Sequence, residues 1–166
     1  MPKNSILGVE TETANEEGVV LFNSEKAAEI IAQQKPMDPQ VIARVRANLE
    51  KKGIYIVQDE DGDAYVISQG SEAVVMYEGG SETTIVMHTN ISASGFFEEL
   101  IHIGQLQSGR AIIYDKENEI EMEIEAKERL IKNQCAYEIT DFEVAELTKS
   151  LNSYRIRLDE MRRVRG

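Results

Sequence analysis

The segment "GFFEELIHIGQ", residues 95 to 105, places two adjacent carboxylates and one of the chain's two histidines among apolar residues. At about 100° per residue, its apolar side chains cover most of the circumference of a helix over 95–107, which predicts a helix that is buried nearly all round. Glu98, His102 and Gln105 fall at i, i+4 and i+7, within a wedge of about 60°, and Glu99 lies to one side. The apolar residues are Phe96, Phe97, Leu100, Ile101, Ile103 and Leu106.

A buried polar stripe of this kind requires compensation, because an unpaired buried carboxylate shifts its pKa or requires a cation. One form of compensation is a set of hydrogen bonds, or a salt bridge to Arg or Lys from a neighbouring element. The other is a metal ion. Glu98 and His102, at i and i+4, can converge on one cation while Glu99 faces a bound water as general base. The residues alone leave both forms open.

The letters "EELIH", residues 98 to 102, resemble the zincin metallopeptidase motif H-E-x-x-H. Glu98 stands in place of the first histidine, Glu99 is at the general-base position and His102 is at the second ligand position. The resemblance implies a divalent metal such as zinc and hydrolysis of peptide bonds. Glu98 departs from the motif, and a carboxylate ligand makes the metal-bound water less acidic. This predicts either a metal other than zinc or loss of peptidase activity.

Zincins with a glutamate as third ligand take it from a later helix, which directs attention to "NEIEMEIEAKERLI", residues 118 to 131. On a helix, Glu123 lies within the apolar arc, and the other acids lie opposite as a solvated face. The pattern E-x-E-A at 123–126 resembles the third-ligand helix of the ImmA/IrrE-like zincins, which implies Glu123 as the third ligand. The alternation also fits a strand, in which Glu123 would be exposed and the ligand argument would fail.

A looser resemblance covers about residues 85 to 160, which look like the zincin-like C-terminal domains of bacterial polymorphic toxins and phage head proteins. It implies a metallopeptidase-type effector domain that is released from a larger delivered protein. Its partners would be a protein or peptide substrate and a cognate immunity protein. The alternative is a catalytically inert zincin scaffold that serves as a binding or immunity-type module, which the glutamate at position 98 favours. A nuclease-type toxin domain is a third, disfavoured reading.

The periodicity of the whole chain predicts an α+β, zincin-like fold in which an antiparallel β-meander packs against helices. Asp38 and Pro39 mark the start of a helix over 38–53, and Thr140 with Glu143 forms a capping box at the start of the last helix. The other predicted helices are 23–34, with Ser24 as N-cap, 95–107 and 117–134, and the last is 140–163. The predicted strands are "IYIVQ" (54–58), "AYVIS" (64–68), "AVVMYE" (73–78) and "TTIVMHT" (83–89).

Two further features receive less specific interpretations. The acidic stretch with Asp59, Asp61 and Asp63 is predicted to be a solvated hairpin turn, because it lacks the bidentate glutamate of a calcium loop. His88, the other histidine, either enters the metal site or lies on an edge strand without a role, and the second interpretation is favoured.

Composition limits the classes of protein to consider. The 166 residues predict a single domain over 19–166 behind a flexible arm over 1–18. A net charge of −12 disfavours nucleic acid as a partner, and Cys135 as the sole cysteine excludes an internal disulfide.

No run approaches the roughly 20 apolar residues of a membrane span, so the expectation is a cytoplasmic fragment, or one delivered within a larger protein. The basic residues of 155–166 are expected to complement a helix dipole rather than bind an acidic partner.

Overall fold

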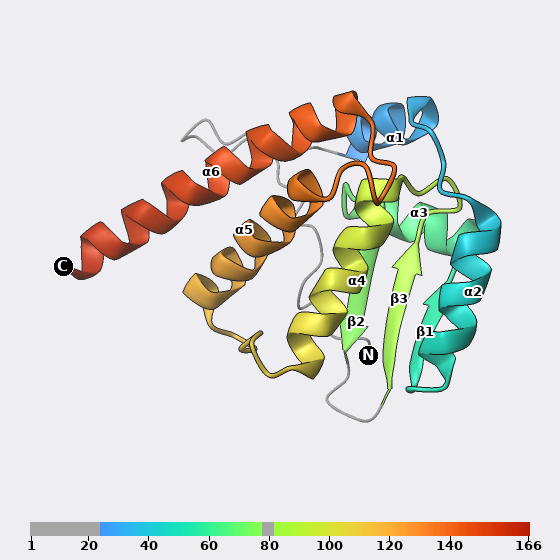
Figure 1. The fold of residues 1–166 in the computed structure, drawn as a ribbon, viewed down its shortest axis with the longest axis horizontal. Coiled ribbons are helices and arrows are strands. Elements are labelled where there is room, and N and C mark those ends of the chain that lie inside the picture. The colour runs from blue at the N-terminus through green and yellow to red at the C-terminus, as the bar shows by residue number, and fades with distance from the viewer. Residues whose placement is uncertain (1–23, 78–81) are drawn as a thin grey trace. The chain divides into compact units, whose positions relative to one another are not determined.

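The computed structural model describes residues 24–77 and 82–166, and these form an α+β fold (Figure 1). The predicted arm over 1–18 lies outside the described residues. In chain order the elements are α1 (Ser24–Gln33), α2 (Pro39–Glu50), β1 (Ile54–Val57), α3 (Glu60–Ser68), β2 (Ala73–Tyr77), β3 (Thr83–Met87), α4 (Ala93–Gln107), α5 (Lys116–Lys132) and α6 (Asp141–Arg165).

The chain divides into two compact units, Met1–Glu99 and Leu100–Gly166, and the division falls inside α4. The first unit contains α1 to α3, the sheet and the start of α4. The second contains the rest of α4, with α5 and α6. The prediction of a single domain over 19–166 stays a prediction.

The sheet differs from the predicted meander. Within the described residues it has three strands in the order β1-β3-β2, and it is mixed. β1 runs parallel to β3, with Ile54 opposite Thr83, whereas β2 runs antiparallel to β3, with Ala73 opposite Met87. The prediction of an antiparallel meander was therefore wrong.

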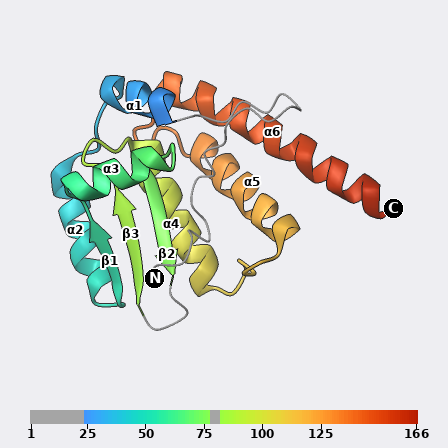
Figure 2. The same ribbon diagram turned by 180° about the vertical axis from the view of Figure 1, so that it is seen from behind.

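The second predicted strand, "AYVIS" (64–68), is part of α3. Asp59 caps this helix, because its side chain accepts a hydrogen bond from the N–H of Gly62 at 2.7 Å. Asp61 and Asp63 lie in the first turn, where carboxylates are stabilised by the partial positive charge of a helix N-terminus. The acidic stretch is thus a helix start, not a hairpin turn. α3 packs against β3 and crosses one face of the sheet (Figure 2), and Val66 forms a buried cluster with Val74 and Val86.

The residues that mark the starts of helices gave more reliable predictions than the strand patterns did. The side chain of Asp38 accepts from the N–H of Gln40 at 2.9 Å, and Pro39 is the first residue of α2, as predicted. α2 ends at Glu50, three residues before Gly53, which has a φ of 77° and leads into β1. Glycine is favoured there because L side chains rarely adopt a positive φ.

In the second unit α5 and α6 pack side by side, with Ile120, Tyr154 and Leu158 buried between them (Figure 1). The predicted capping box of Thr140 and Glu143 is confirmed at the start of α6. These helices begin and end within about two residues of their predicted bounds, which is the ordinary precision of such predictions.

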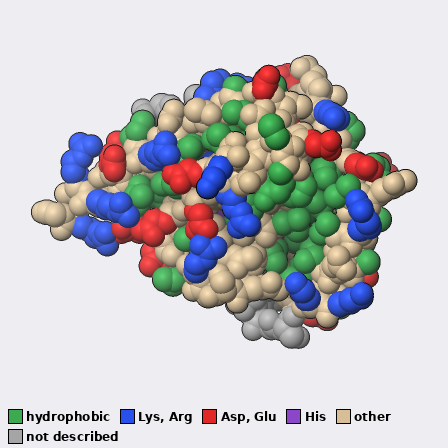
Figure 3. All heavy atoms as spheres, in the orientation of Figure 1, with side chains coloured by type: hydrophobic (Ala, Val, Ile, Leu, Met, Phe, Trp, Pro, Cys, Tyr) green, Lys and Arg blue, Asp and Glu red, His purple; other side chains and the backbone are tan. Residues whose placement is uncertain are grey.

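The basic end of the chain pairs with acids of α5. Arg162 donates to Glu117 at 3.2 Å and to Glu121 at 3.1 Å, and Arg155 donates to Glu128 at 2.8 Å. The hydrogen bond to Glu117 raises the pKa of Arg162 above its ordinary value. Basic and acidic side chains alternate over this part of the surface (Figure 3). The arginines therefore have intramolecular partners, in addition to the dipole interaction that was expected.

Across the described ranges 24–77 and 82–166, none of the helices combines the length and the apolar character that a bilayer crossing demands.

Candidate metal centre

The polar stripe of α4 is buried, as its position among apolar residues predicted. Glu98 is 5% exposed, and Glu99, His102 and Gln105 have no exposed surface. No histidine surface is visible on the face shown in Figure 3. Because α4 is one continuous helix, Glu98 lies one turn before His102 on the same side.

The segment with the candidate third ligand is helical. α5 begins after Asp115, whose side chain accepts from the N–H of Asn118 at 3.0 Å. Glu123 and Ala126 are buried in α5, whereas Glu121 and Glu125 are half-buried. The strand alternative for this segment is therefore wrong, and the helical projection identified the buried carboxylate correctly.

The three candidate ligands from α4 and α5 come together. One ligand atom each of Glu98, His102 and Glu123 lies within 4.8 Å of the other two. Nε2 of His102 in α4 lies 3.3 Å from Oε1 of Glu123 in α5. In a tetrahedral site with bonds of about 2.0–2.2 Å, ligand atoms lie about 3.4 Å apart. The group can therefore hold a divalent ion if its ligand atoms move closer together by up to about 1.4 Å.

Gln105 orients His102. The side-chain N–H of Gln105 donates to the carbonyl oxygen of Met122 in α5 at 3.1 Å, so Oε1 of Gln105 faces Nδ1 of His102 at 2.8 Å. An amide oxygen only accepts, and Nδ1 of His102 must therefore carry a proton. In the neutral imidazole this leaves the lone pair on Nε2, the atom that faces Glu123. Such a hydrogen bond to the distal nitrogen is typical of metal-binding histidines.

Lys127 was missed by the sequence reasoning. Its Nζ lies 2.8 Å from Oε2 of Glu123, and both side chains are buried. The ammonium also lies 5.0 Å from the ring centroid of Tyr154 in α6. A signal was present, because Lys127 follows Glu123 by four residues and projects into the same apolar arc as Ile120. One oxygen of Glu123 thus faces an ammonium, and the other faces His102.

Of the two forms of compensation that the sequence left open, the salt bridge is present and the ligand geometry is compatible with a metal ion. A salt bridge satisfies one oxygen of Glu123, although its lysine comes from the same helix rather than from a neighbouring element. The other oxygen lies 3.3 Å from Nε2 of His102, and Glu123 is one of the three residues that could hold a metal ion. Glu99, the predicted general base, is completely buried next to Glu98, and its role stays a prediction.

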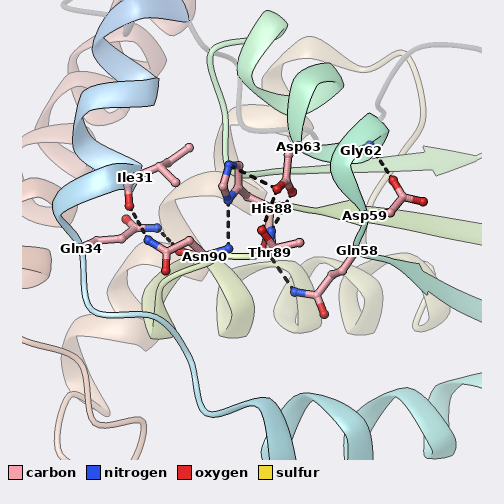
Figure 4. A network of polar contacts seen from close by, with 9 residues as sticks. All are labelled: Ile31, Gln34, Gln58, Asp59, Gly62, Asp63, His88, Thr89 and Asn90. Atoms are coloured by element: carbon pink, nitrogen blue, oxygen red, sulfur yellow. Dashed lines mark hydrogen bonds and ion pairs between the residues drawn. The ribbon is translucent and has the colours of Figure 1, made fainter.

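His88 does not belong to this group within the described part of the chain. It follows β3, where its Nδ1 accepts from the N–H of Asn90 at 2.9 Å and its Nε2 lies 3.8 Å from Asp63 (Figure 4). Asp63 also accepts from the N–H and the hydroxyl of Thr89, at 2.8 and 2.6 Å. The carbonyl of His88 accepts from the side chain of Gln58 at 3.2 Å. His88 therefore belongs to a network that ties together elements of the first unit.

Comparison of the chain with protein-family models, with curated proteins and with solved structures finds no match in any of the three. The motif "EELIH" and the Glu-His-Glu group are thus the observations on which a functional hypothesis can be built.

Proposed function

We propose that the chain is a metal-dependent hydrolase of the peptidase type, in which Glu98, His102 and Glu123 bind a divalent ion. The observation that carries the proposal is the meeting of three buried ligand atoms within 4.8 Å. The hydrogen bond from His102 to Gln105 supports it, because it directs the lone pair of Nε2 toward Glu123.

A divalent ion in such a site polarises a carbonyl and makes a bound water more acidic. The proposed role of Glu99 is to take the proton of the attacking water and to deliver it to the leaving amine. Glu98 and Glu123 would make the water less acidic than neutral ligands do, so manganese and iron are candidates beside zinc. The resemblance to toxin-associated zincins extends the proposal: the chain would be a delivered effector domain that acts on a protein or peptide substrate. A cognate immunity protein would be its second partner.

A second candidate function is an inert binding or immunity-type module on the same scaffold. The contact between Lys127 and Glu123 favours it, because a buried carboxylate with an ammonium partner is stable without a metal. The absence of exposed surface on Glu99 and His102 favours it as well, because a hydrolase must admit water and substrate to these groups.

The first experiment is elemental analysis of the dialysed protein beside His102→Ala. The matched control is His88→Ala, which removes the chain's other histidine and leaves the group intact. We expect near-stoichiometric zinc, manganese or iron in the wild type and the control, and loss of the ion in His102→Ala. In the dialysed apoprotein, an ion at 100 times its Kd should add about 2.7 kcal/mol to the free energy of unfolding. This corresponds to a rise of roughly 5–10 °C in Tm.

Hydrolysis of an unfolded protein such as casein then separates the two candidates. Glu99→Gln should keep the metal and lose hydrolysis, because the amide cannot accept a proton. Metal without hydrolysis in the wild type would favour the inert module. If neither the wild type nor the control holds a metal and added ions fail to bind, the hydrolase proposal is wrong.

A further inference from the structure

We propose that Lys127 holds Glu123 as a one-oxygen ligand and thereby makes the site select zinc-like transition ions over calcium. This inference rests on the proposed metal binding by Glu98, His102 and Glu123, and it assigns Lys127 as a positioning residue.

The contact is set within one helix. Lys127 and Glu123 are one turn apart in α5, and Nζ lies 2.8 Å from Oε2. The side chains of Lys127 and Glu123 are only 5% and 4% exposed, so the pair is shielded from the water and salt that weaken surface ion pairs. The ring of Tyr154, at 5.0 Å, gives the ammonium a second favourable contact.

The two oxygens of Glu123 therefore have different surroundings. Oε2 faces Lys127, and Oε1 faces Nε2 of His102 at 3.3 Å. The ammonium occupies one lone pair of Oε2 and fixes the orientation of the carboxylate, which disfavours chelation of an ion through both oxygens. The group then offers one imidazole nitrogen and single carboxylate oxygens.

This donor set suits some ions better than others. Calcium takes six to eight oxygen ligands and commonly uses a bidentate carboxylate, whereas zinc accepts four ligands that include imidazole. The ammonium also lowers the negative charge of the site, and ligand charge is one determinant of calcium affinity. Both effects of Lys127 disfavour calcium more than zinc.

The test is titration calorimetry of the metal-free protein with zinc chloride and with calcium chloride. Lys127→Met keeps the length of the side chain and removes the charge, which frees Oε2 of Glu123. We expect calcium to bind about tenfold more tightly or better, and the ratio of zinc to calcium affinity to fall by a similar factor. Lys127→Gln, which is polar and neutral, should shift the ratio in the same direction and serves if the methionine variant does not fold.

Two controls and a spectrum make the test specific. Lys127→Arg keeps the charge and should retain the wild-type ratio, and Lys132→Met removes an exposed lysine of the same helix and should change nothing. The visible spectrum of the Co²⁺-loaded protein should weaken in Lys127→Met, because absorption falls as coordination number rises above four.

The possible outcomes distinguish a failure of the proposed role of Lys127 from a failure of the proposed metal site. If the wild type binds neither zinc nor cobalt, both the metal site and the role of Lys127 are wrong. If the wild type binds zinc and the neutral variants keep its affinity ratio and its Co²⁺ spectrum, the role of Lys127 alone is overturned.

Discussion

Replacement of Gln105 by methionine tests the buried hydrogen bond through which this residue orients His102. Gln105 is fully buried, with Oε1 2.8 Å from Nδ1 of His102 and its N–H donating to Met122. Methionine has a similar volume and can make neither bond. The Nδ1–H of His102 would lose this buried acceptor, which costs about 1–3 kcal/mol. We therefore expect the free energy of unfolding of the metal-free protein to fall by about that amount.

The assay is urea unfolding followed by far-ultraviolet circular dichroism, since the chain has no tryptophan to report by fluorescence. A double-mutant cycle with His102→Ala isolates the contact, and we expect a coupling of about 0.5–1.5 kcal/mol. The same replacement should weaken zinc binding roughly 10- to 100-fold, because the partner of a metal-binding imidazole orients it.

Gln107→Met is the matched control, since Gln107 is an exposed glutamine at the end of the same helix. Its effect should stay within about 0.5 kcal/mol. A Gln105→Met protein that unfolds at the wild-type urea concentration, or a coupling near zero, would refute a stabilising hydrogen bond between Gln105 and His102.

Four further substitutions test predictions about stability with the same urea assay. Gly95→Ala would place a Cβ against Oε1 of Glu72 and break that carboxylate's hydrogen bonds to Ser92 at the start of α4, so it should lower the free energy of unfolding by about 1 kcal/mol or more. Gly104→Ala in the same helix meets nothing within 4 Å and should raise it by about 0.5–1 kcal/mol; equal effects at the two positions would contradict this reasoning. Leu130→Ala removes a fully buried side chain of α5 and should cost about 2–5 kcal/mol, and a smaller loss would mean that α5 is less tightly packed than described. Arg162→Gln removes solvent-exposed ion pairs to α5 and should leave the unfolding midpoint unchanged, which a clear shift would disprove.

The features that could be predicted from sequence are those that neighbouring residues determine. Asp38 with Pro39, and Thr140 with Glu143, start their helices through contacts within a single turn. Helical periodicity likewise placed Glu123 in the apolar arc, because that position depends only on the residues of one helix.

Three of the four predicted strands are confirmed as β1, β2 and β3. The predictions failed for one segment and for the way in which β1 pairs. The short stretch "AYVIS" alternates like a strand, yet the cap at Asp59 makes it part of α3. The parallel pairing of β1 with β3 joins residues about 29 positions apart, as Ile54 and Thr83 show. The short spacing between predicted strands suggests antiparallel hairpins, and it carries no information about a parallel pair that is joined by a long crossover.

In the candidate site, too, some features follow from the local sequence and others only from tertiary packing. The spacing of "EELIH" alone determined that Glu98 and His102 lie one turn apart on a buried helix. Only the packing of α5 with α4 brought Oε1 of Glu123 to 3.3 Å from Nε2 of His102, and only the packing of α6 on α5 placed Tyr154 beside the ammonium of Lys127. Helical spacing is a local property of the backbone, whereas the meeting of charges from separate helices depends on how their apolar faces pack.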